Sequence, residues 1–309
     1  MKNILIIGGN GYLGSNIVSK LIKDKKYNIN LLCSTEVESN FGSNVNIVKG
    51  KLKDFDKINE AIKKDRIDTI LHLASSILPN SSYEDLLKEE IDIIVPTQNI
   101  IRLCSKKEIK FVFFSSGGAV YGETKIKEIK ETHPLNPMSY YGFAKKKIED
   151  FIQFEARNNN LKFLILRPSN PYGGYINYNH NHGLILAIIN CIKNNKTLNI
   201  YVDKNTTRDF IHVDELVDIV IRLLKSKNKN GCFNIATGFG TSISDICDFF
   251  LKKFPNRFRV KYHENLIKDV SSSVLCVNKL NKNYSKRVKI SFTEGLNIIS
   301  ETLIDTPLE

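Results

Sequence analysis

The sequence contains no hydrophobic run long enough to cross a membrane. Apolar runs such as residues 4–7 and 111–114 hold four residues each, whereas a membrane-spanning helix needs about 20. Lys2 precedes only four apolar residues before a glycine-rich segment, and this run is too short for the apolar part of a signal peptide. We therefore expect a cytoplasmic protein with no membrane association.

Cysteines at the spacing of metal sites or disulfide frameworks are also missing. The six cysteines are scattered, and no two of them form a C-x-x-C pair. Zinc sites and small disulfide-linked domains need tighter spacing, so we expect free thiols in a reducing compartment. His180 and His182 alternate in a polar segment without a neighbouring cysteine or carboxylate. We expect them to be solvated and to hold no metal.

Positive charge prevails, but not in the pattern of a nucleic-acid-binding protein. The 45 lysines and arginines exceed the 33 aspartates and glutamates, which gives a net charge of +12. The lysines form short clusters, and no basic stripe is interleaved with aromatic residues. We expect a solvated, lysine-rich surface and no nucleic-acid partner. A positive field of this kind would attract a small polyanionic substrate.

Short β-branched runs alternate with helical patterns in the first half of the chain. The pattern predicts strands at residues 3–7, 29–33, 46–48, 69–72, 110–115 and 162–167. It predicts helices at residues 12–23, 55–64, 83–106 and 140–159. This alternation indicates an α/β fold of the Rossmann type, a doubly wound parallel sheet whose ligand crevice opens at the carboxyl ends of its strands.

After Pro168, predicted strands and helices no longer alternate regularly. The pattern there predicts helices at residues 184–194, 214–225, 242–254 and 293–303, and strands at residues 197–202 and 233–235. We predict a larger domain formed by residues 1–167 and roughly 209–236. A smaller α/β lobe would comprise residues 168–208 and 237–309.

Three glycines connect the first predicted strand to the first predicted helix. Gly8 allows a tight turn, Gly11 lets backbone approach a pyrophosphate, and Gly14 lets the helix pack close to the strand. The N-terminus of that helix would point its N–H groups at phosphates. Because the glycines end a buried type of strand and begin a helix, the segment predicts a dinucleotide-binding loop.

Tyr141 and Lys145 stand four residues apart in a predicted helix and therefore share one face of it. A phenol with a reference pKa of about 10 is a poor base at neutral pH. A nearby ammonium group favours the phenolate. Tyr141 could then exchange a proton with a sugar hydroxyl or carbonyl while a nicotinamide exchanges a hydride.

Taken together, these residues resemble the extended short-chain dehydrogenase/reductase family, which comprises nucleotide-sugar epimerases, dehydratases and reductases. The resemblance continues at residues 68–74, 115–122 (SSGGAVYG), 166–173 (LRPSNPYG) and 208–214 (RDFIHVD), in the family's order and spacing. As a set, these segments are specific for the family and much less so for the substrate.

The resemblance implies site residues position by position. The larger domain would bind the dinucleotide and the smaller lobe a nucleotide sugar, with Tyr172 at the border of the sugar pocket. Besides the three glycines, the cofactor would contact Tyr12, Leu13, Ser34, Lys51, Leu73, Ala74, Ser115, Tyr141 and Lys145. The substrate would contact Ser116, Gly117, Tyr121, Asn170 and Arg208, and the guanidinium fork of the last suits a diphosphate.

Three positions depart from the family's pattern near the cofactor and the reacting sugar. The family's catalytic serine or threonine corresponds to Gly117, so Ser116 or a water would have to supply the hydroxyl. The acidic residue that NAD-specific members place on the ribose 2′-hydroxyl corresponds to Cys33, and Lys51 replaces an aspartate after the third strand. A 2′-phosphate would be tolerated there, so the cofactor is NADP or NAD.

Two further segments differ from the family's phosphate-binding patterns. They are residues 266–269 (LIKD) and 202–204 (VDK). Nucleotide recognition is therefore altered, and the nucleotide base stays open.

Two main functions follow from the resemblance. A reductase would deliver hydride to C4 of a nucleotide-linked 4-keto-6-deoxyhexose, for surface-polysaccharide synthesis, with Tyr141 donating the proton. A 4-epimerase would oxidise C4 and return the hydride to the other face with a permanently bound NAD. We favour the reductase, because a site that leans towards NADP suits an exchangeable cofactor.

The remaining alternatives are weaker. A 4,6-dehydratase is disfavoured because Gly118 and Ala119 occupy the positions of its acidic pair. A non-catalytic dinucleotide-binding scaffold would not need both Tyr141 and Lys145. Family members commonly pair through a helix bundle that includes the helix of the tyrosine, so the resemblance implies a homodimer.

Overall fold

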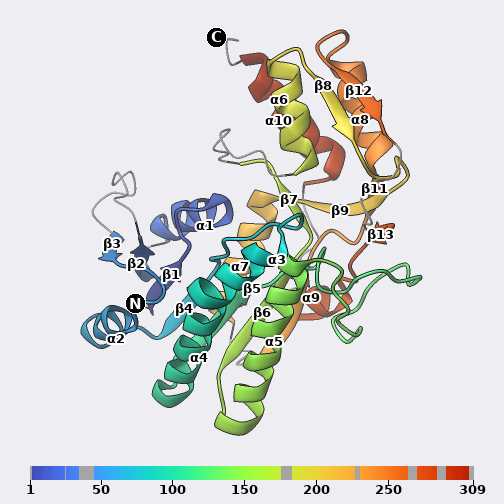
Figure 1. Cartoon of the computed structure of the whole chain (residues 1–309). Helices are drawn as coiled ribbons and strands as arrows, with labels where there is room; N and C mark the ends of the chain where they lie inside the picture. Colours follow the sequence, from blue (N-terminus) through green and yellow to red (C-terminus); the bar gives the residue numbers. More distant parts are fainter. Residues whose placement is uncertain are drawn as a thin grey trace. The chain divides into compact units, whose positions relative to one another are not determined.

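The computed structural model describes residues 2–24, 26–34, 45–174, 183–226, 230–263, 270–283 and 290–305. The chain forms two compact units, drawn in Figure 1. Unit 1 comprises Met1–Val120, Leu135–Arg167 and Val217–Phe233, and unit 2 comprises Tyr121–Pro134, Pro168–Leu216 and Asn234–Glu309.

A seven-stranded sheet forms the centre of unit 1, in the order β10-β6-β5-β4-β1-β2-β3. Its strands are β1 (Lys2–Ile7), β2 (Tyr27–Cys33), β3 (Val45–Lys49), β4 (Thr69–His72), β5 (Lys110–Phe114), β6 (Phe163–Pro168) and β10 (Gly231–Ile235). Neighbouring strands from β3 to β6 pair in parallel. The strand order reverses direction between β1 and β4, and this is the switch point at which open α/β sheets bind ligands.

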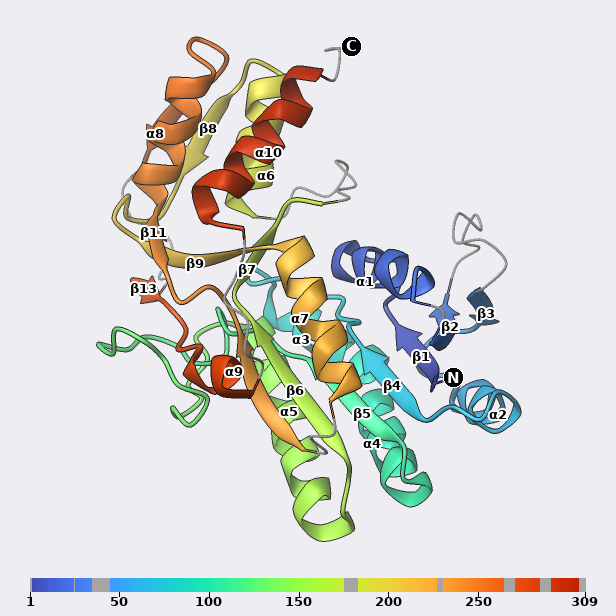
Figure 2. The ribbon, with the colours of Figure 1, turned by 180° about the vertical axis from the view of Figure 1, so that it is seen from behind.

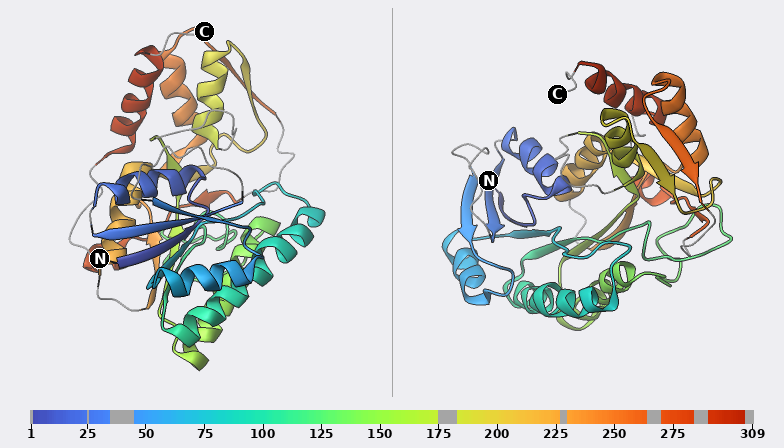
Figure 3. Two further views of the ribbon diagram at one scale, coloured as in Figure 1. Left: turned by 90° about the vertical axis from the view of Figure 1, so that its left-hand side faces the viewer. Right: turned by 45° about the horizontal axis from the view of Figure 1, so that its top comes forward.

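Helices cover both faces of this sheet, as Figures 2 and 3 show. One face carries α1 (Tyr12–Ile22) and α7 (Val213–Lys225), which are joined by an ion pair of 3.0 Å between Lys20 and Asp218. The other face carries α2 (Phe55–Lys64), α4 (Val95–Lys107) and α5 (Tyr140–Asn159), with α4 packed on both of its neighbours. The predicted Rossmann-type α/β fold is confirmed.

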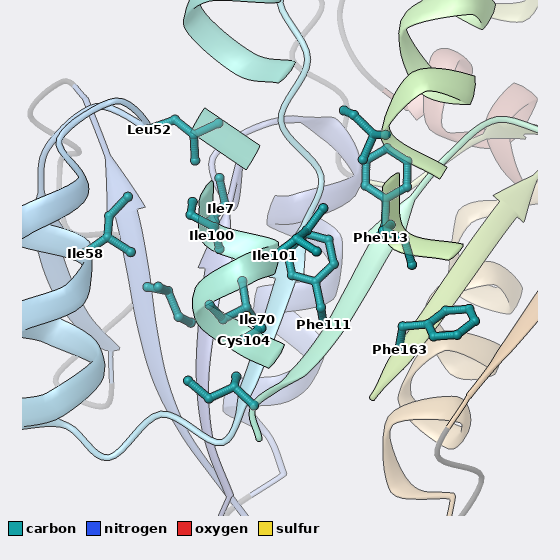
Figure 4. Close-up of a cluster of buried hydrophobic side chains, with 14 of the residues drawn as sticks. Ile7, Leu52, Ile58, Ile70, Ile100, Ile101, Cys104, Phe111, Phe113 and Phe163 are labelled. Atoms are coloured by element: carbon teal, nitrogen blue, oxygen red, sulfur yellow. The ribbon is translucent and has the colours of Figure 1, made fainter. Parts of the chain in front are cut away.

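One hydrophobic cluster of unit 1 lies between the sheet and the helices α2, α4 and α5. Isoleucine dominates it, and Figure 4 shows Ile70, Phe111 and Phe113 from the sheet facing Ile100 and Ile101 of α4. All five side chains are fully buried. Strands buried on both faces need continuous apolar runs, and this requirement explains the ILII and FVFF segments.

The helix predicted for residues 83–106 is present, but it is not uniform, because a π-helical turn precedes Pro96. The segment folds as α3 (Tyr83–Glu89), a π-helical turn η1 (Glu90–Ile94) and α4. Proline lacks an N–H group and its ring clashes with the carbonyl four residues earlier. The widened π turn accommodates this position, and such turns are frequent at functional sites.

Unit 2 contains two small sheets and a helical layer. Its elements are β7 (Asn170–Tyr172), β8 (Thr197–Ile200), β9 (Thr207–His212), β11 (Gly240–Ser242), β12 (Arg259–Tyr262), β13 (Ser272–Ser273), α6 (Leu184–Lys193), α8 (Ile243–Lys253), α9 (Asn278–Asn283) and α10 (Phe292–Asp305). β9 pairs with β7, β11 and β13, and β8 pairs with β12. Ile188, Ile246 and Phe250 are fully buried in its core.

The compact units differ from the predicted ranges in residues 121–134, 209–216 and 234–236, all of which belong to unit 2. The Tyr121 hydroxyl donates to Asn234 at 2.6 Å. Ile129 bridges to Leu275 in parallel. These long-range contacts bind 121–134 to unit 2, and sequence periodicity does not reveal them.

The described residues contain no helix that is both long and apolar enough to cross a membrane.

A buried ion pair fastens α5 to the sheet. Arg167 of β6 donates from Nε to Glu149 of α5 at 3.0 Å, and both residues are at most 5 % exposed. A carboxylate and a guanidinium can both remain charged in the interior only as a hydrogen-bonded pair. The pair therefore fixes the height of α5 along β6.

Arg167→Ala should lower the free energy of unfolding by about 3–5 kcal/mol, because it leaves the Glu149 carboxylate buried without its partner. Urea unfolding followed by circular dichroism measures the loss. Lys162→Ala is the control, since Lys162 pairs with the exposed Glu108 and surface pairs contribute little. Equal losses in the two variants would show that the buried pair has no special role in holding α5.

Candidate functional site

The glycine turn between β1 and α1 is closed on one side and open on the other. Gly8 has a φ of +82°, which side chains disfavour, and its carbonyl accepts from the Gly11 N–H at 3.2 Å. A Cβ on Gly14 would lie 2.6 Å from the Gly9 Cα, so only glycine lets α1 approach the turn. A Cβ on Gly11 would meet only the Gly8 oxygen, at 3.5 Å. Backbone at Gly11 is therefore accessible, as an anion-binding turn requires.

A cavity of about 440 Å³ lies beside this turn, at the carboxyl ends of β1, β2, β3 and β4. Six of the predicted cofactor-binding residues line it: Gly8, Gly11, Ser34, Lys51, Leu73 and Ala74. Tyr12, Leu13 and Gly14 lie in the first turn of α1 instead. Sequence reasoning missed Ser75, Lys53 and Asp92, which also line the cavity, because no motif includes these three residues.

Lysines surround a second cavity, of about 450 Å³, that shares Ser34, Gly50, Lys51 and Lys53 with the first. Its other described lining residues are Lys49, Asp54 and Lys57. Four ammonium groups therefore face one carboxylate, and that carboxylate accepts the Lys51 N–H at 2.8 Å. Such a cavity attracts an anion.

Cys33 does not take part in this second cavity. Its side chain is 2 % exposed, and burial raises the pKa of the thiol. The residue that meets the cavity at the end of β2 is Ser34. Cys33, at the position where NAD-specific family members carry an acidic residue, is therefore buried in the core.

Tyr141 and Ser116 lie close together in the structure. Tyr141 lies in the first turn of α5 and Ser116 lies two residues beyond β5. Burial raises the pKa of the Tyr141 phenol, the Ser116 hydroxyl lowers it, and the charge of Glu89 raises it. The Ser116 side chain thus lies near the phenol, one residue before Gly117.

Gly142 permits this contact. A Cβ there would overlap the Ala119 carbonyl oxygen and lie 2.9 Å from the Pro137 Cβ. The start of α5 consequently packs directly on the turn that follows Ser116. Nothing in the spacing of tyrosine and lysine indicated this requirement.

Lys145 is buried one helical turn beyond Tyr141, with 3 % of its surface exposed. Its Nζ lies 5.6 Å from the centre of the Tyr141 ring and 5.2 Å from that of Phe113. Burial lowers the pKa of Lys145 to about 8, and the charges of Glu89 and Glu149 oppose this shift. The predicted pairing of Tyr141 and Lys145 on one helix face is therefore present in the structure.

The side chain of Ser115 is buried, and its hydroxyl has no hydrogen-bond partner among the described residues. Its backbone N–H donates to the Leu166 carbonyl at 2.8 Å. A buried hydroxyl without a protein partner is suited to a ligand.

The predicted substrate residues of unit 2 differ in how far their polar groups already form hydrogen bonds within the protein. The Tyr121 hydroxyl is occupied by Asn234, and the residue is 2 % exposed. The Asn170 amide donates to the Asp209 carbonyl at 2.8 Å. Tyr172 is 5 % exposed and packs edge-on against His212. Tyr121 and Tyr172 are thus parts of the packing of unit 2.

Arg208 lies in β9 and donates from Nη1 to the Thr207 carbonyl at 3.0 Å. Hydrogen bonds from Ser271 hold the pKa of Glu123 below its usual range, and the charge of Arg208 adds to that effect. Arg208 therefore has a carboxylate nearby.

Asp209 is a buried residue that the sequence did not single out for a structural role. Its carboxylate accepts from the Thr237 N–H at 3.0 Å, the Thr237 hydroxyl at 2.8 Å and the Gly238 N–H at 2.9 Å. Burial raises its pKa against these hydrogen bonds. It holds the loop before β11 in place.

Residues 180, 182 and 266–269, which entered the sequence argument, lie outside the described part of the chain. Within the described part, no three histidine, cysteine, aspartate or glutamate side chains are grouped as a metal site would need.

Comparison with known proteins identifies the family. Residues 4–236 match the model of the NAD dependent epimerase/dehydratase family. A putative UDP-glucose 4-epimerase of Methanocaldococcus jannaschii is 34 % identical over 248 residues, covering 79 % of this chain and 80 % of the relative. The chain belongs to the NAD dependent epimerase/dehydratase family.

Two other relatives align over nearly the whole chain. The structure of a UDP-glucose 4-epimerase from Thermotoga maritima, determined with UDP-glucose, has a TM-score of 0.88 and 28 % identity, covering 97 % of both chains. A dTDP-4-dehydro-6-deoxyglucose reductase of Escherichia coli is 22 % identical over 314 aligned positions, covering 98 % of both. The family therefore includes both epimerases and a reductase among the relatives of this chain.

Ser116→Ala should raise the pKa of Tyr141 further, because the hydroxyl that opposes the effect of burial is lost. Titration of isotope-labelled tyrosine by NMR measures the shift, with Tyr141→Phe to assign the signal. Ser115→Ala is the matched control, one residue away from Ser116. If the two serine variants titrate alike, Ser116 does not act on the phenol.

Proposed function

We propose that the protein transfers hydride to C4 of a nucleotide-linked 4-keto sugar, with Tyr141 as the proton donor. The observation that carries this proposal is the buried Lys145, whose Nζ lies 5.6 Å from the centre of the Tyr141 ring, with Ser116 close to the phenol. A phenol beside a hydroxyl, one helical turn from an ammonium group, suits proton exchange with a sugar oxygen.

The residues around the glycine turn fit a dinucleotide. The open backbone of Gly11 and the N-terminus of α1 would receive the pyrophosphate, and Leu73 and Ala74 would contact the cofactor from β4. A bound nicotinamide supplies or accepts the hydride. Tyr141 then holds the proton that the sugar oxygen gains, Ser116 orients the phenol, and Lys145 stabilises the phenolate that remains.

The lysines at the ends of β2 and β3 support NADP(H) as an accepted cofactor. Lys49, Lys51, Lys53 and Lys57 surround the second cavity, and a 2′-phosphate on the adenosine ribose would be attracted to it. A cofactor that is exchanged after each turnover suits net reduction. This is our reason for preferring a reductase, in the synthesis of sugars for surface polysaccharides.

A 4-epimerase is the second candidate. The identities of 34 % to the M. jannaschii relative and 28 % to the T. maritima epimerase favour it. The same Tyr141 and Ser116 would serve both functions, since an epimerase removes and returns a hydride at one carbon. The two functions differ in whether the cofactor is consumed.

Unit 2 would hold the nucleotide sugar. Among its described residues, we assign Asn170 and Arg208 to the diphosphate of the substrate, because they match the corresponding positions of the family motifs. Exposed apolar side chains on α3, η1 and α5, among them Leu87, Ile91 and Phe154, support pairing of two copies.

A panel of 4-keto and 4-hydroxy nucleotide sugars tests these functions. Stoichiometric oxidation of NAD(P)H with a 4-keto sugar is the expected result. Isomerisation without consumption, with NAD retained on the purified protein, would replace the reductase by the epimerase. Dinucleotide binding with no turnover of any sugar would indicate a non-catalytic scaffold.

Tyr141→Phe should lower kcat by about 10²–10⁴-fold, the usual contribution of a positioned acid or base, while cofactor binding stays nearly unchanged. Stopped-flow kinetics and fluorescence titration with NAD(P)H measure the two effects. A variant that retains the wild-type rate would remove Tyr141 from the mechanism.

Lys51→Ala should weaken NADPH binding roughly tenfold and leave NADH binding nearly unchanged, because one charge-assisted contact to the 2′-phosphate is lost. Fluorescence titration with both cofactors provides the comparison. Lys64→Ala, at the exposed end of α2, is the control for net charge. Equal weakening of both cofactors would exclude a 2′-phosphate site at Lys51.

A further inference from the structure

A buried carboxylate lies between the cofactor cavity and the Tyr141–Lys145 pair. Glu89 is the last residue of α3 and is 1 % exposed. No motif in the sequence includes it. The function proposed above also leaves it without a role, although burying a carboxylate is costly unless it is well hydrogen-bonded.

The hydrogen bonds of Glu89 all come from the segment that follows β4. Its carboxylate accepts from the Ser75 hydroxyl at 2.9 Å, the Ser76 N–H at 2.8 Å and the Ser76 hydroxyl at 2.5 Å. Hydrogen bonds to an ionised acceptor are stronger than neutral ones. Ser75 itself lines the cavity of about 440 Å³, next to Leu73 and Ala74. Glu89 does not line the cavity itself, but its hydrogen bonds hold the segment of Ser75 that forms part of the cavity wall.

The backbone at Glu89 is positioned by the change from an α-helix to a π-helix. The π-helical turn η1 begins at the next residue, Glu90. Asp92 and Ile93 of the same turn line the cavity. The turn therefore places Glu89 beneath the cavity wall and two of its own residues on the cavity surface.

The charge of Glu89 also reaches the reacting pair. It raises the pKa of Tyr141, and it is the larger of the two acidic effects on Lys145. The other groups that face the pair are Ser116, Glu149 and His72. Glu149 is neutralised by Arg167, whereas the hydrogen bonds of Glu89 come from neutral donors.

His72 does not compete with Glu89 for this role. Burial lowers its pKa to about 3, and its Nε2 lies 2.9 Å from the Thr97 hydroxyl. It is therefore neutral at physiological pH and contributes no full charge. Glu89 remains as a charged group next to Lys145 whose charge is not cancelled by a cation.

We propose that Glu89 is a positioning residue that holds the Ser75–Ser76 wall of the cofactor cavity and supplies a negative charge near Lys145. The proposal deepens the proposed function and rests on it for the identity of the cofactor. Through its charge, Glu89 opposes the lowering of the Lys145 pKa by burial and raises the pKa of the Tyr141 phenol. Through its hydrogen bonds, it keeps the wall in the shape that a dinucleotide meets.

Glu89→Gln tests both parts of the proposal. The titration of Tyr141 in the free protein should shift to lower pH, because a negative charge that opposes the phenolate is removed. The dissociation constant for NAD(P)H should rise roughly tenfold, because the amide cannot accept all the hydrogen bonds of the carboxylate. NMR of isotope-labelled tyrosine and fluorescence titration provide these readouts without turnover.

Glu90→Gln is the matched control. It removes the same charge one residue along the helix, from a carboxylate that pairs with Lys147. It should change neither readout. If Glu90→Gln and Glu89→Gln behave alike, the effect is one of net charge and the proposal is wrong.

Ser76→Ala separates the two parts, and it serves if Glu89→Gln does not fold. It removes one hydrogen bond and keeps the carboxylate, so cofactor binding should weaken several-fold while the titration of Tyr141 stays close to that of the wild type. Unchanged cofactor binding in this variant would overturn the role of the wall.

The outcomes also separate this proposal from the proposed function. A shifted Tyr141 titration in a protein that reduces no nucleotide sugar would retain Glu89 and reject the reductase. Turnover of a 4-keto sugar with an identical pH profile in wild type and Glu89→Gln would retain the reductase and reject the role of Glu89.

Discussion

Helix α5 carries a lysine into the interior of unit 1, and the arrangement around Tyr141 depends on how that ammonium is stabilised. Moving an ammonium from water into protein costs several kcal/mol unless opposite charge or hydrogen bonds compensate. Lys145 meets the rings of Phe113 and Tyr141 and the field of two carboxylates, Glu89 and Glu149. Arg167 balances the second of these carboxylates.

This set of charges joins three elements of unit 1. Glu89 ends α3, Lys145 and Glu149 belong to α5, and Arg167 belongs to β6. Each must hold its position for the others to remain buried and charged. The helix that presents the phenol is therefore fixed to the sheet electrostatically as well as by apolar packing. Rigid support of this kind is what a proton-transferring group requires.

The sequence predicted the fold of unit 1 well, since its strands are continuous apolar runs and its helices have clear periodicity. Residues 55–64, 69–72 and 140–159 form the predicted elements with the predicted bounds. The helix at 83–106 was predicted without its π-helical turn, because the apolar pattern continues through Pro96. Unit 2 was harder, because short strands such as β13 exist only through long-range pairing.

The candidate site was predicted unevenly for a related reason. The glycine turn and the pair of Tyr141 and Lys145 are local sequence patterns, and each is compatible with one arrangement of the chain. Both could therefore be predicted from the sequence. Glu89 and its hydrogen-bond partners come from different elements, and they come together only when the sheet is assembled. The lysines of the second cavity likewise surround it only in the folded structure. The function of Tyr121 was predicted from its motif, whereas its hydroxyl binds Asn234, more than a hundred residues away.

Ser116 lies near the phenol, one residue before the position where the family places the hydroxyl. The turn after β5 and the absence of a side chain at Gly142 allow this, since α5 can then sit directly on the turn. The serine near the phenol is thus offset by one position from the residue that the family resemblance predicts. A search that scores catalytic columns one by one would classify such a chain as an inactive homologue, whereas one that compares atoms would keep it among the enzymes.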